Sequence, residues 1–169
     1  DPLEQVAADL DRHAVTAGWD APPRLYALVP ADVLVASEPA LRHRQDLAEA
    51  PPGALAPVEQ AALPAAGTLS QALARITWPG RVAGAALVVE RVILPPGVEQ
   101  TMPDVPDERR AWLDAQPERD DVRITVAVLR DGRSAAVVRL RSHDDDAAVL
   151  RGPDLVPDLA RSLAATLRP

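Results

Sequence analysis

Apolar residues recur along the chain with two different periods, and each period predicts a type of element. Over residues 2–17 they return every three or four positions, which is typical of a helix with one buried face. Gly18 suits the left-handed position just beyond the end of such a helix. Residues 154–167 show the same period and predict a C-terminal helix, with an apolar stripe of Leu155, Leu159, Leu163 and Leu167.

Strands are expected in four segments that are rich in valine, leucine and isoleucine. Residues 82–94 are the most apolar of these and do not alternate with polar positions, so both faces of this strand should be covered. Residues 24–29, 121–129 and 133–141 predict three further strands. A strand that is covered on both faces lies inside a sheet, so we expect residues 82–94 to be central.

The last two strands form a hairpin whose register follows from the apolar pattern. A two-residue loop would mix apolar and polar residues on both faces of the hairpin. A three-residue loop at 130–132, with its glycine left-handed, instead places Ile124 opposite Val138 and makes one face wholly apolar. We therefore predict the three-residue loop, which also places Arg123 opposite Arg139 on the other face.

Eighteen prolines mark the breaks between elements. They indicate an Ala/Pro-rich connector of weak order at residues 48–67 and a loop at residues 95–106. Short helices are expected between the breaks, at residues 30–35, 37–47 and 107–116, and from Thr68 to a stop at residues 78–80. Because helices and strands do not alternate strictly, we predict one α+β domain over residues 1–169, with a mainly antiparallel sheet and flanking helices.

Composition and charge exclude several classes of function. The formal net charge of −7 argues against a nucleic-acid binder and against a protein that binds anionic membranes. The chain contains neither Cys nor Lys, which excludes disulfides, thiolate metal sites and Schiff-base cofactors. We expect no cofactor. No apolar run is long enough to span a membrane and no secretory leader is seen, so we expect a cytoplasmic protein.

Glu90 and Arg91 are candidate ligand-binding residues, because both lie in the predicted central strand and point to opposite faces. A charge in such a strand must be paired or must lie near the end of the sheet. The simpler interpretation is that each side chain meets an opposite charge there. The alternative is that the Glu90 carboxylate lies in an apolar pocket and acts as an acid, a base or a ligand anchor.

Arg123 and Arg139 are the other candidate ligand-binding residues, because the predicted register brings two like charges together, with Arg141 nearby. Such a pair is destabilising unless an anion lies between the two groups. One interpretation is therefore a site for an anion or an acidic peptide. The simpler interpretation is a solvated edge that acidic residues of the turn at 117–121 cover.

The remaining candidates are three tryptophans and one polar segment. Trp19, Trp78 and Trp112 lie at element ends or on a short helix, where they either fill the core or anchor a protein partner. Residues 142–146, Ser-His-Asp-Asp-Asp, combine the residue types of a catalytic triad and of a cation site. Neighbouring side chains on an extended segment diverge, so we predict a solvated loop, no catalytic residue and no metal site.

Four parts of the sequence are distinctive: residues 18–20 with 24–29, residues 89–91 with 94–96, residues 122–132 and residues 152–157. In these segments the chain resembles an uncharacterised family of actinobacterial proteins of unknown function, and the resemblance extends over nearly the whole chain. It implies a bacterial cytoplasmic protein. It supplies no activity, cofactor or catalytic residue that could be assigned to this chain.

Two hypotheses on function follow. The leading one is a non-enzymatic protein-interaction or chaperone-like module that binds a protein partner or itself, as a homodimer. It rests on the absence of cofactor motifs, the acidic net charge, the proline-rich loops and the tryptophans at element ends. The alternative is a small enzyme or ligand-binding protein that uses Glu90 with a nearby arginine in a pocket.

Overall fold

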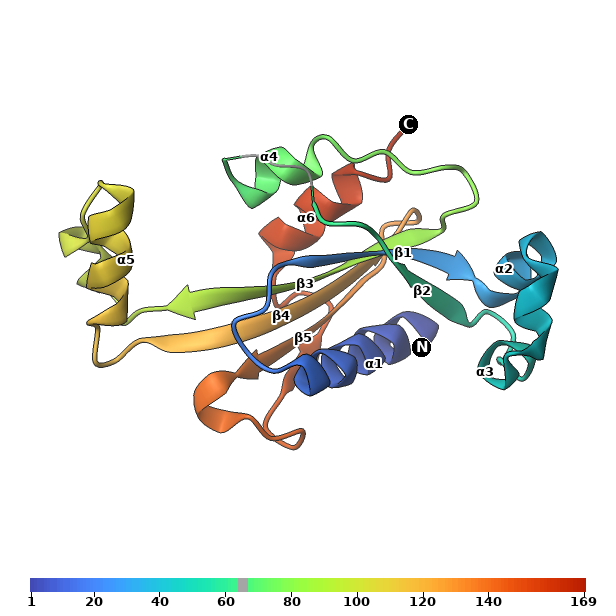
Figure 1. The fold of residues 1–169 in the computed structure, drawn as a ribbon, viewed down its shortest axis with the longest axis horizontal. Helices are drawn as coiled ribbons and strands as arrows, with labels where there is room; N and C mark the ends of the chain where they lie inside the picture. Colours follow the sequence, from blue (N-terminus) through green and yellow to red (C-terminus); the bar gives the residue numbers. More distant parts are fainter. Residues whose placement is uncertain (64–66) are drawn as a thin grey trace.

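The computed structural model describes residues 1–63 and 67–169, and its centre is a six-stranded antiparallel sheet of order β2-β1-β3-β4-β5-β6 (Figure 1). The strands are β1 Arg24–Pro30, β2 Leu55–Glu59, β3 Gly84–Ile93, β4 Asp120–Leu129, β5 Ser134–Leu140 and β6 Leu150–Gly152. The helices are α1 Pro2–Ala17, α2 Ala31–Ser37, α3 Gln45–Ala48, α4 Leu69–Leu73, α5 Pro106–Asp114 and α6 Pro157–Ala165. Three short 3-10 helices are η1 Pro39–His43, η2 Val98–Thr101 and η3 Arg141–His143. The predicted α+β class with an antiparallel sheet is confirmed.

Helices cover both faces of the sheet. In Figure 1, α1 lies along one face, and α6 lies with α4 on the opposite face. The apolar stripe of α1 packs against residues of β1, β3, β4 and β5 that point toward it, and α6 packs against the residues that alternate with them. Each of the central strands therefore has side chains in two cores. This arrangement confirms the prediction that the segment 82–94 is covered on both faces.

Local signals place the ends of α1 and α4. The Asp1 carboxylate accepts a hydrogen bond of 2.9 Å from the backbone N–H of Leu3, and Gly18 beyond the last turn has a φ of 79°. In α4 the side chains of Thr68 and Gln71 each accept a hydrogen bond from the other's backbone N–H. Such contacts satisfy backbone donors that a helix leaves free at its start.

The hairpin between β4 and β5 has the predicted register. Ile124 lies opposite Val138, and Arg123 lies opposite Arg139. The N–H of Leu129 donates to the carbonyl of Arg133 at 2.9 Å, which closes a three-residue loop. Its glycine, Gly132, has a φ of 92°, the left-handed conformation that this loop requires.

Four expectations from the sequence were wrong in extent. The helix expected from Thr68 to the break at 78–80 is the shorter α4, which ends at Leu73. The predicted connector at 48–67 contains β2, which pairs with β1; its residues 64–66 lie outside the described residues. The predicted helix at 37–47 is split into η1 and α3, and a further short strand, β6, pairs with β5. The C-terminal helix begins at Pro157, because a proline fits the first helical turn, so Leu155 lies outside the helix and is 38% exposed.

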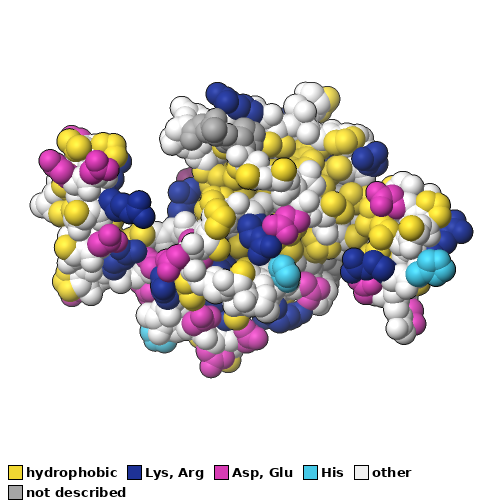
Figure 2. Space-filling model, in the orientation of Figure 1, with side chains coloured by type: hydrophobic (Ala, Val, Ile, Leu, Met, Phe, Trp, Pro, Cys, Tyr) yellow, Lys and Arg dark blue, Asp and Glu magenta, His cyan; other side chains and the backbone are white. Residues whose placement is uncertain are grey.

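The hairpin of β3 and β4 continues beyond the rest of the sheet. Figure 1 shows these two strands as a ribbon that passes the start of β1 and ends at α5, and Figure 2 shows the α5 region as a lobe apart from the main body. None of the residues of α5 is buried. The predicted loop at 95–106 connects β3 to this helix and includes η2.

Candidate functional site

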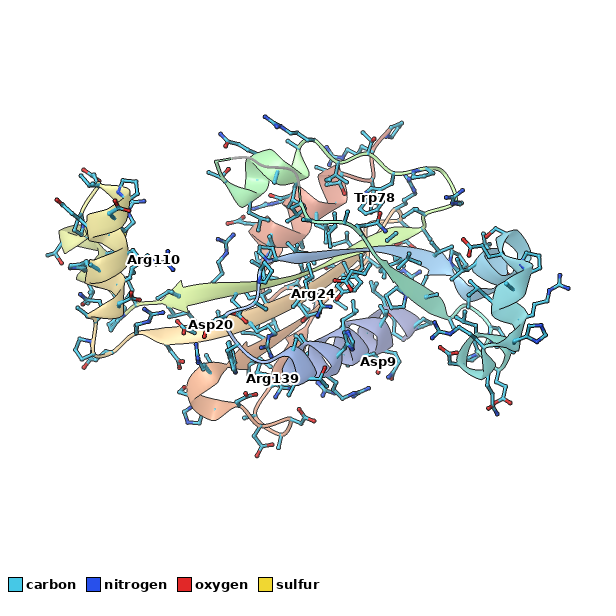
Figure 3. The ribbon with its side chains drawn as sticks, viewed as in Figure 1. Asp9, Asp20, Arg24, Trp78, Arg110 and Arg139 are labelled. Carbon is cyan, nitrogen blue, oxygen red and sulfur yellow. The ribbon has the colours of Figure 1, made fainter. Side chains whose placement is uncertain are left out.

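Arg139 lies between the sheet and α1, where it is 2% exposed (Figure 3). Its Nη2 atom is 2.6 Å from Oδ2 of Asp11 and 2.6 Å from Oδ1 of Asp146, and its Nη1 atom is 3.1 Å from Oδ1 of Asp144. Asp11 comes from α1 and is also 2% exposed. The hydrogen bonds to Asp11, above all, raise the pKa of the Arg139 guanidinium. This side chain thus joins α1, β5 and the loop after η3.

Arg123 lies opposite Arg139 on the same face and is 1% exposed. Its Nη2 atom donates to the carbonyl of Gly18 at 2.6 Å and lies 3.5 Å from Oε1 of Glu90. The guanidinium also lies over the ring of Trp19, 4.3 Å from the ring centre, where a cation–π interaction stabilises it. Arg123 therefore helps hold the end of α1 against the sheet.

These contacts overturn the expectation that Arg123 and Arg139 lie on a solvated edge. They are buried because α1 packs across that face of β4 and β5, and the acidic residues that neutralise them come from α1, β3 and the loop at 144–146. Internal carboxylates occupy the positions that an external anion would take. The loop at 142–146 was expected to be solvated, but it also takes part in ion pairs, since two of its aspartates bind Arg139.

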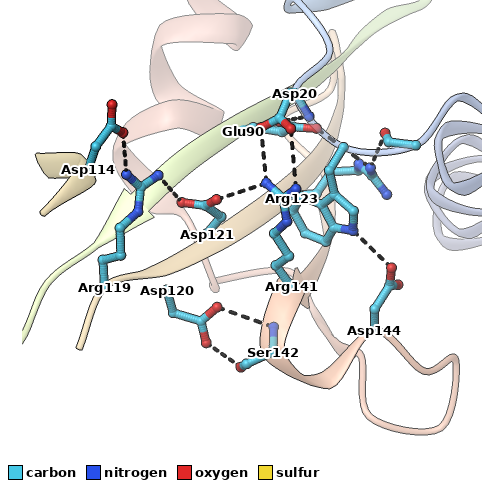
Figure 4. Close-up of polar contacts among 12 residues, drawn as sticks. Asp20, Glu90, Asp114, Arg119, Asp120, Asp121, Arg123, Arg141, Ser142 and Asp144 are labelled. Carbon is cyan, nitrogen blue, oxygen red and sulfur yellow. Dashed lines mark hydrogen bonds and ion pairs between the residues drawn. The ribbon is translucent and has the colours of Figure 1, made fainter. Parts of the chain in front are cut away.

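Glu90 is held by the chain that follows α1. Its carboxylate accepts a hydrogen bond of 2.8 Å from the N–H of Asp20, a longer one of 3.5 Å from Ala21, and pairs with Arg123 (Figure 4). The cavity beside it has a volume of about 10 Å³. Such a space holds about one water molecule, not a substrate. Arg91 points to the opposite face and is exposed, and its guanidinium has no hydrogen bond or ion pair with another described residue.

A chain of ion pairs continues from this cluster toward α5. Figure 4 shows Arg141 between Asp20 and Asp121, at 3.0 and 3.1 Å. Arg119 links Asp121 to Asp114, the last residue of α5, at 2.7 and 2.8 Å. These groups are partly exposed, so each pair adds little stability, but together they connect α5 to the sheet.

The contact between Trp19 and Asp144 makes stability depend on pH. The indole N–H, 2.8 Å from Oδ2 of Asp144, holds the pKa of this carboxyl below its usual value. A lowered folded-state pKa stabilises the fold above the ordinary aspartate pKa, and this stabilisation is lost as the pH falls through the folded-state value. We expect Asp144→Ala to lower the unfolding free energy at neutral pH, and the difference from wild type to shrink below about pH 4. Urea titrations at pH 7, 5 and 3 measure it.

The control for this experiment is Asp154→Ala, since Asp154 is exposed and has no hydrogen bond or ion pair with another described residue. We expect it to leave the unfolding free energy nearly unchanged at all three pH values. A difference for Asp144→Ala that stayed constant down to pH 3 would show that this carboxyl has the same pKa in the folded and unfolded chains.

The three tryptophans lie on separate parts of the fold and do not form one site. The ring of Trp19 contacts the guanidinium groups of Arg123 and Arg141. Trp78 packs against the core under α6 and donates a hydrogen bond of 2.8 Å to Oγ1 of Thr166. Trp112 is a half-buried residue of α5. Trp78 adjoins a hollow of about 260 Å³, which is large enough to accept part of another molecule.

A large hollow, which we call the groove, lies beside β2 at the end of the sheet remote from α5. Its volume is about 930 Å³, which is within the usual range for binding sites. It is bounded by the first half of α1, by β2 and by the segment from α2 to α3. Aliphatic side chains contribute to its lining, namely Val6, Leu34, Leu41, Leu47, Leu55 and Val58.

Acidic groups predominate at the groove. Among the described residues, its lining includes one arginine, Arg44, and six acidic residues: Asp1, Asp9, Glu38, Asp46, Glu49 and Glu59. Arg44 pairs with Asp46 at 2.7 Å, and Arg24 of β1 pairs with Glu59 at 2.8 Å. Glu38 and Glu49 have no cationic partner among the described residues. The groove therefore has apolar surface with an excess of negative charge around it.

A smaller hollow of about 260 Å³ continues the groove across β2. The two hollows share Leu34, Glu38 and Val58, and the smaller one extends to Trp78 and Arg81. Val58 is 37% exposed. A bound segment could therefore pass over the edge strand and reach the indole ring of Trp78.

Sequence reasoning missed both Asp11 and the groove. Asp11 lies four residues after Ala7 and three before Ala14, which are both on the buried stripe of α1. An acidic residue in line with an apolar stripe is a signal for a buried ion pair, although it does not show which arginine pairs with it. The groove left a weaker signal, since its leucines lie in short helices without a regular apolar period.

The fold and the groove define an α+β protein in which helices cover both faces of one antiparallel sheet. Residues 3–168 match the family described as PPA1309-like protein, and the chain belongs to this family. No curated protein and no solved structure matches the chain.

Within residues 1–63 and 67–169 every helix is too short or too polar to cross a bilayer. No three His, Asp or Glu side chains in these ranges converge in a way that could hold a metal ion. The aspartates around Arg139 do converge, but a guanidinium is at their centre.

Proposed function

We propose that the protein is a non-enzymatic interaction module that binds an amphipathic helix of a partner protein in the groove. The observation that carries the proposal is a hollow of about 930 Å³ with aliphatic lining and an excess of acidic groups. Apolar side chains of a partner would be removed from water there, and basic side chains would meet Glu38 and Glu49. Helix-in-groove binding is a common mode of peptide recognition.

A helix fits this groove better than an added strand because of Pro57. In β2, Ala56 and Val58 lie opposite Val29 and Ala27, and the bond from the N–H of Gln60 to the carbonyl of Leu25 shows that even-numbered residues of β2 face β1. The main chain of Pro57 therefore faces outward. Proline lacks the N–H that a further strand would need at that position.

Trp78 belongs to the proposal as a candidate anchor. It is half-buried, so part of its ring can be covered by a partner, and buried aromatic residues often dominate the energetics of interfaces. Trp19 is already used in the contact with Arg123, and Trp112 belongs to α5, which Figure 1 shows at the end of the molecule remote from β2. Leu34, which both hollows share, would connect the anchor to the main groove.

The proposal includes a cytoplasmic protein of an actinobacterium. A composition rich in Ala, Arg and Pro, without Lys, Asn or Phe, supports it because it is typical of a GC-rich genome. A second copy is the alternative occupant of the groove. The other function considered, an enzyme or ligand-binding site at Glu90, has less support, because the cavity there is about 10 Å³.

The test uses two designed helical peptides with the same apolar face, one with lysine and one with glutamate at the polar positions. We expect the lysine peptide to bind with a Kd of about 10 μM and the glutamate peptide at least tenfold more weakly. Added salt should weaken binding of the lysine peptide. Leu41→Asp should reduce binding of the lysine peptide tenfold or more, since it places a charge on the apolar lining. Fluorescence polarisation measures all of these.

The matched control is Val105→Asp, at a valine that is 53% exposed and directly precedes α5, which lies remote from the groove in Figure 1. It adds the same charge and should leave binding unchanged. Equal binding of the two peptides, or equal losses in the two variants, would contradict the proposal. A dimer in sedimentation analysis that Leu41→Asp dissociates would identify a second copy as the occupant instead.

A further inference from the structure

β3 has an unpaired edge that the rest of the sheet does not cover. Its pairing with β1 ends at Val88, opposite Arg24, whereas its pairing with β4 continues to Ile93, opposite Asp120. β1 cannot continue the pairing backward, because Arg24 follows two prolines that have no N–H to donate. Figure 1 shows the resulting free edge between the start of β1 and α5. We call residues 90–93 the β3 stub.

The hydrogen-bond pattern shows which main-chain groups of the stub are free. The N–H of Arg130 donates to the carbonyl of Ala83 at 3.0 Å, so odd-numbered residues of β3 direct their main chain toward β4. Even-numbered residues face β1, as the pairing of Val88 with Arg24 requires. The N–H and C=O groups of Glu90 and Val92 consequently point to the open side. They have no backbone partner there among residues 1–63 and 67–169.

The other two edges of the sheet are protected against added strands, but the stub is not. The edge strand β2 carries Pro57 at an outward position, and β6 has only three residues and is followed by Pro153. On the stub, Val92 is 39% exposed and Ile93 is 47% exposed. Free main-chain groups beside exposed β-branched residues are a template for strand addition.

Two arginines beside the stub indicate which charge a segment that pairs with it would carry. Arg91 is exposed on the face opposite Glu90, and Arg110 projects from α5 toward the main body in Figure 3. Neither guanidinium has a hydrogen bond or ion pair with another described residue. Asp107 and Asp114 lie one turn from Arg110 on α5, but Asp114 pairs with Arg119. The side of the stub that carries Arg91 thus has unpaired positive charge.

We propose that the β3 stub is a second docking site, which binds an extended acidic segment of a partner protein as an added β-strand. The main chain of the segment would pair with Val92, which lies beyond the position that Pro22 occupies next to Glu90. Acidic side chains on one face of the segment would meet Arg91 and Arg110, and apolar side chains on the other face would cover Val92. The site shares no residue with the groove, so the two proposals succeed or fail independently.

A second copy of the chain fits the stub less well than a separate segment. One antiparallel register pairs Val92 with Val92 of the second copy. In that register, Leu94 and Pro95 of one copy would clash with the Pro22–Pro23 segment of the other, because both need the same position beside β3. The alternative register, which pairs Arg91 with its own copy, places like charges opposite each other. Both registers are therefore disfavoured.

The test compares two capped peptides, one of alternating Glu and Val and one of alternating Lys and Val. We expect the Glu/Val peptide to bind with a Kd below about 1 mM, and the Lys/Val peptide at least tenfold more weakly. Hydrogen exchange should show new protection of the Val92 amide when the Glu/Val peptide binds. The double variant Arg91→Glu, Arg110→Glu should reverse the order of the two affinities.

Val92→Pro separates main-chain pairing from side-chain contact. It removes an N–H that β4 does not use, so the variant should fold, which circular dichroism will check. It should nevertheless bind the Glu/Val peptide at least tenfold more weakly. Val92→Ala keeps the N–H and should lose no more than threefold. Absence of binding at 1 mM, equal affinity for both peptides, or equal losses in the two variants would overturn the proposal. So would a dimer that Val92→Pro dissociates, which would assign the stub to a second copy.

Discussion

Replacing Asp11 with alanine is expected to destabilise the fold by about 3 kcal/mol. The substitution leaves the guanidinium of Arg139, which is 2% exposed, without the carboxylate that lies 2.6 Å from its Nη2 atom. Removing one partner of a buried ion pair costs about 3–5 kcal/mol because the other charge stays buried. The lower end applies here, since Asp144 and Asp146 still contact the same guanidinium. Urea unfolding at pH 7 measures the loss.

Two further variants test the cause of this destabilisation. Asp146→Ala removes a contact to Arg139 of the same length, but the Asp146 side chain is 66% exposed, so we expect a loss below about 1 kcal/mol. Asp11→Leu combined with Arg139→Met removes both charges and should recover most of the stability. If the two alanine variants lost equal stability, burial of Asp11 would not be the reason for the effect.

Replacing Gly84 with alanine is expected to destabilise the fold by about 3 kcal/mol through a direct clash. A Cβ atom at this position would lie 2.3 Å from the carbonyl oxygen of Val128 and 2.7 Å from Cδ2 of Leu129. The first contact is with the backbone of the neighbouring strand, so a rotamer change cannot relieve it. Overpacking a tight site costs about 1–3 kcal/mol, and a backbone clash belongs at the upper end. In a domain of this size the melting temperature should fall by about 6–12 °C.

The matched control is Gly80→Ala. A Cβ atom at Gly80 would meet nothing within 4 Å, and its φ is not in the left-handed region. Calorimetry should show a change within about 0.5 kcal/mol for this variant. Similar melting temperatures for both variants would mean that β3 and β4 can separate enough to accept a methyl group.

Elements with a strong local period were predicted well. The helix at 2–17, the central strand and the hairpin register follow from which residues must share a face, and the structure has all three. β2 was missed because Pro57 and three neighbouring prolines indicate a loop. A proline is tolerated in this strand because its main chain faces outward from the sheet.

The candidate site could be predicted only in part. The register correctly placed Arg123 opposite Arg139, and the like-charge argument correctly required acidic groups near them. The sequence pattern could not show that these groups come from α1 and the loop at 144–146, because Asp11 is 128 residues away from Arg139. It also could not show that α1 lies over this face.

Sequence alone establishes that this protein is an α+β domain without Cys or Lys, with a central apolar strand and a defined last hairpin. These properties depend on composition and on the spacing of apolar positions, every two residues in a strand and every three or four in a helix, which is a local feature of the sequence. Tertiary packing decides the burial of Arg139, the groove beside β2 and the free edge of the β3 stub. Each of these features depends on how segments that are distant in the sequence pack against one another. No local sequence pattern encodes that packing.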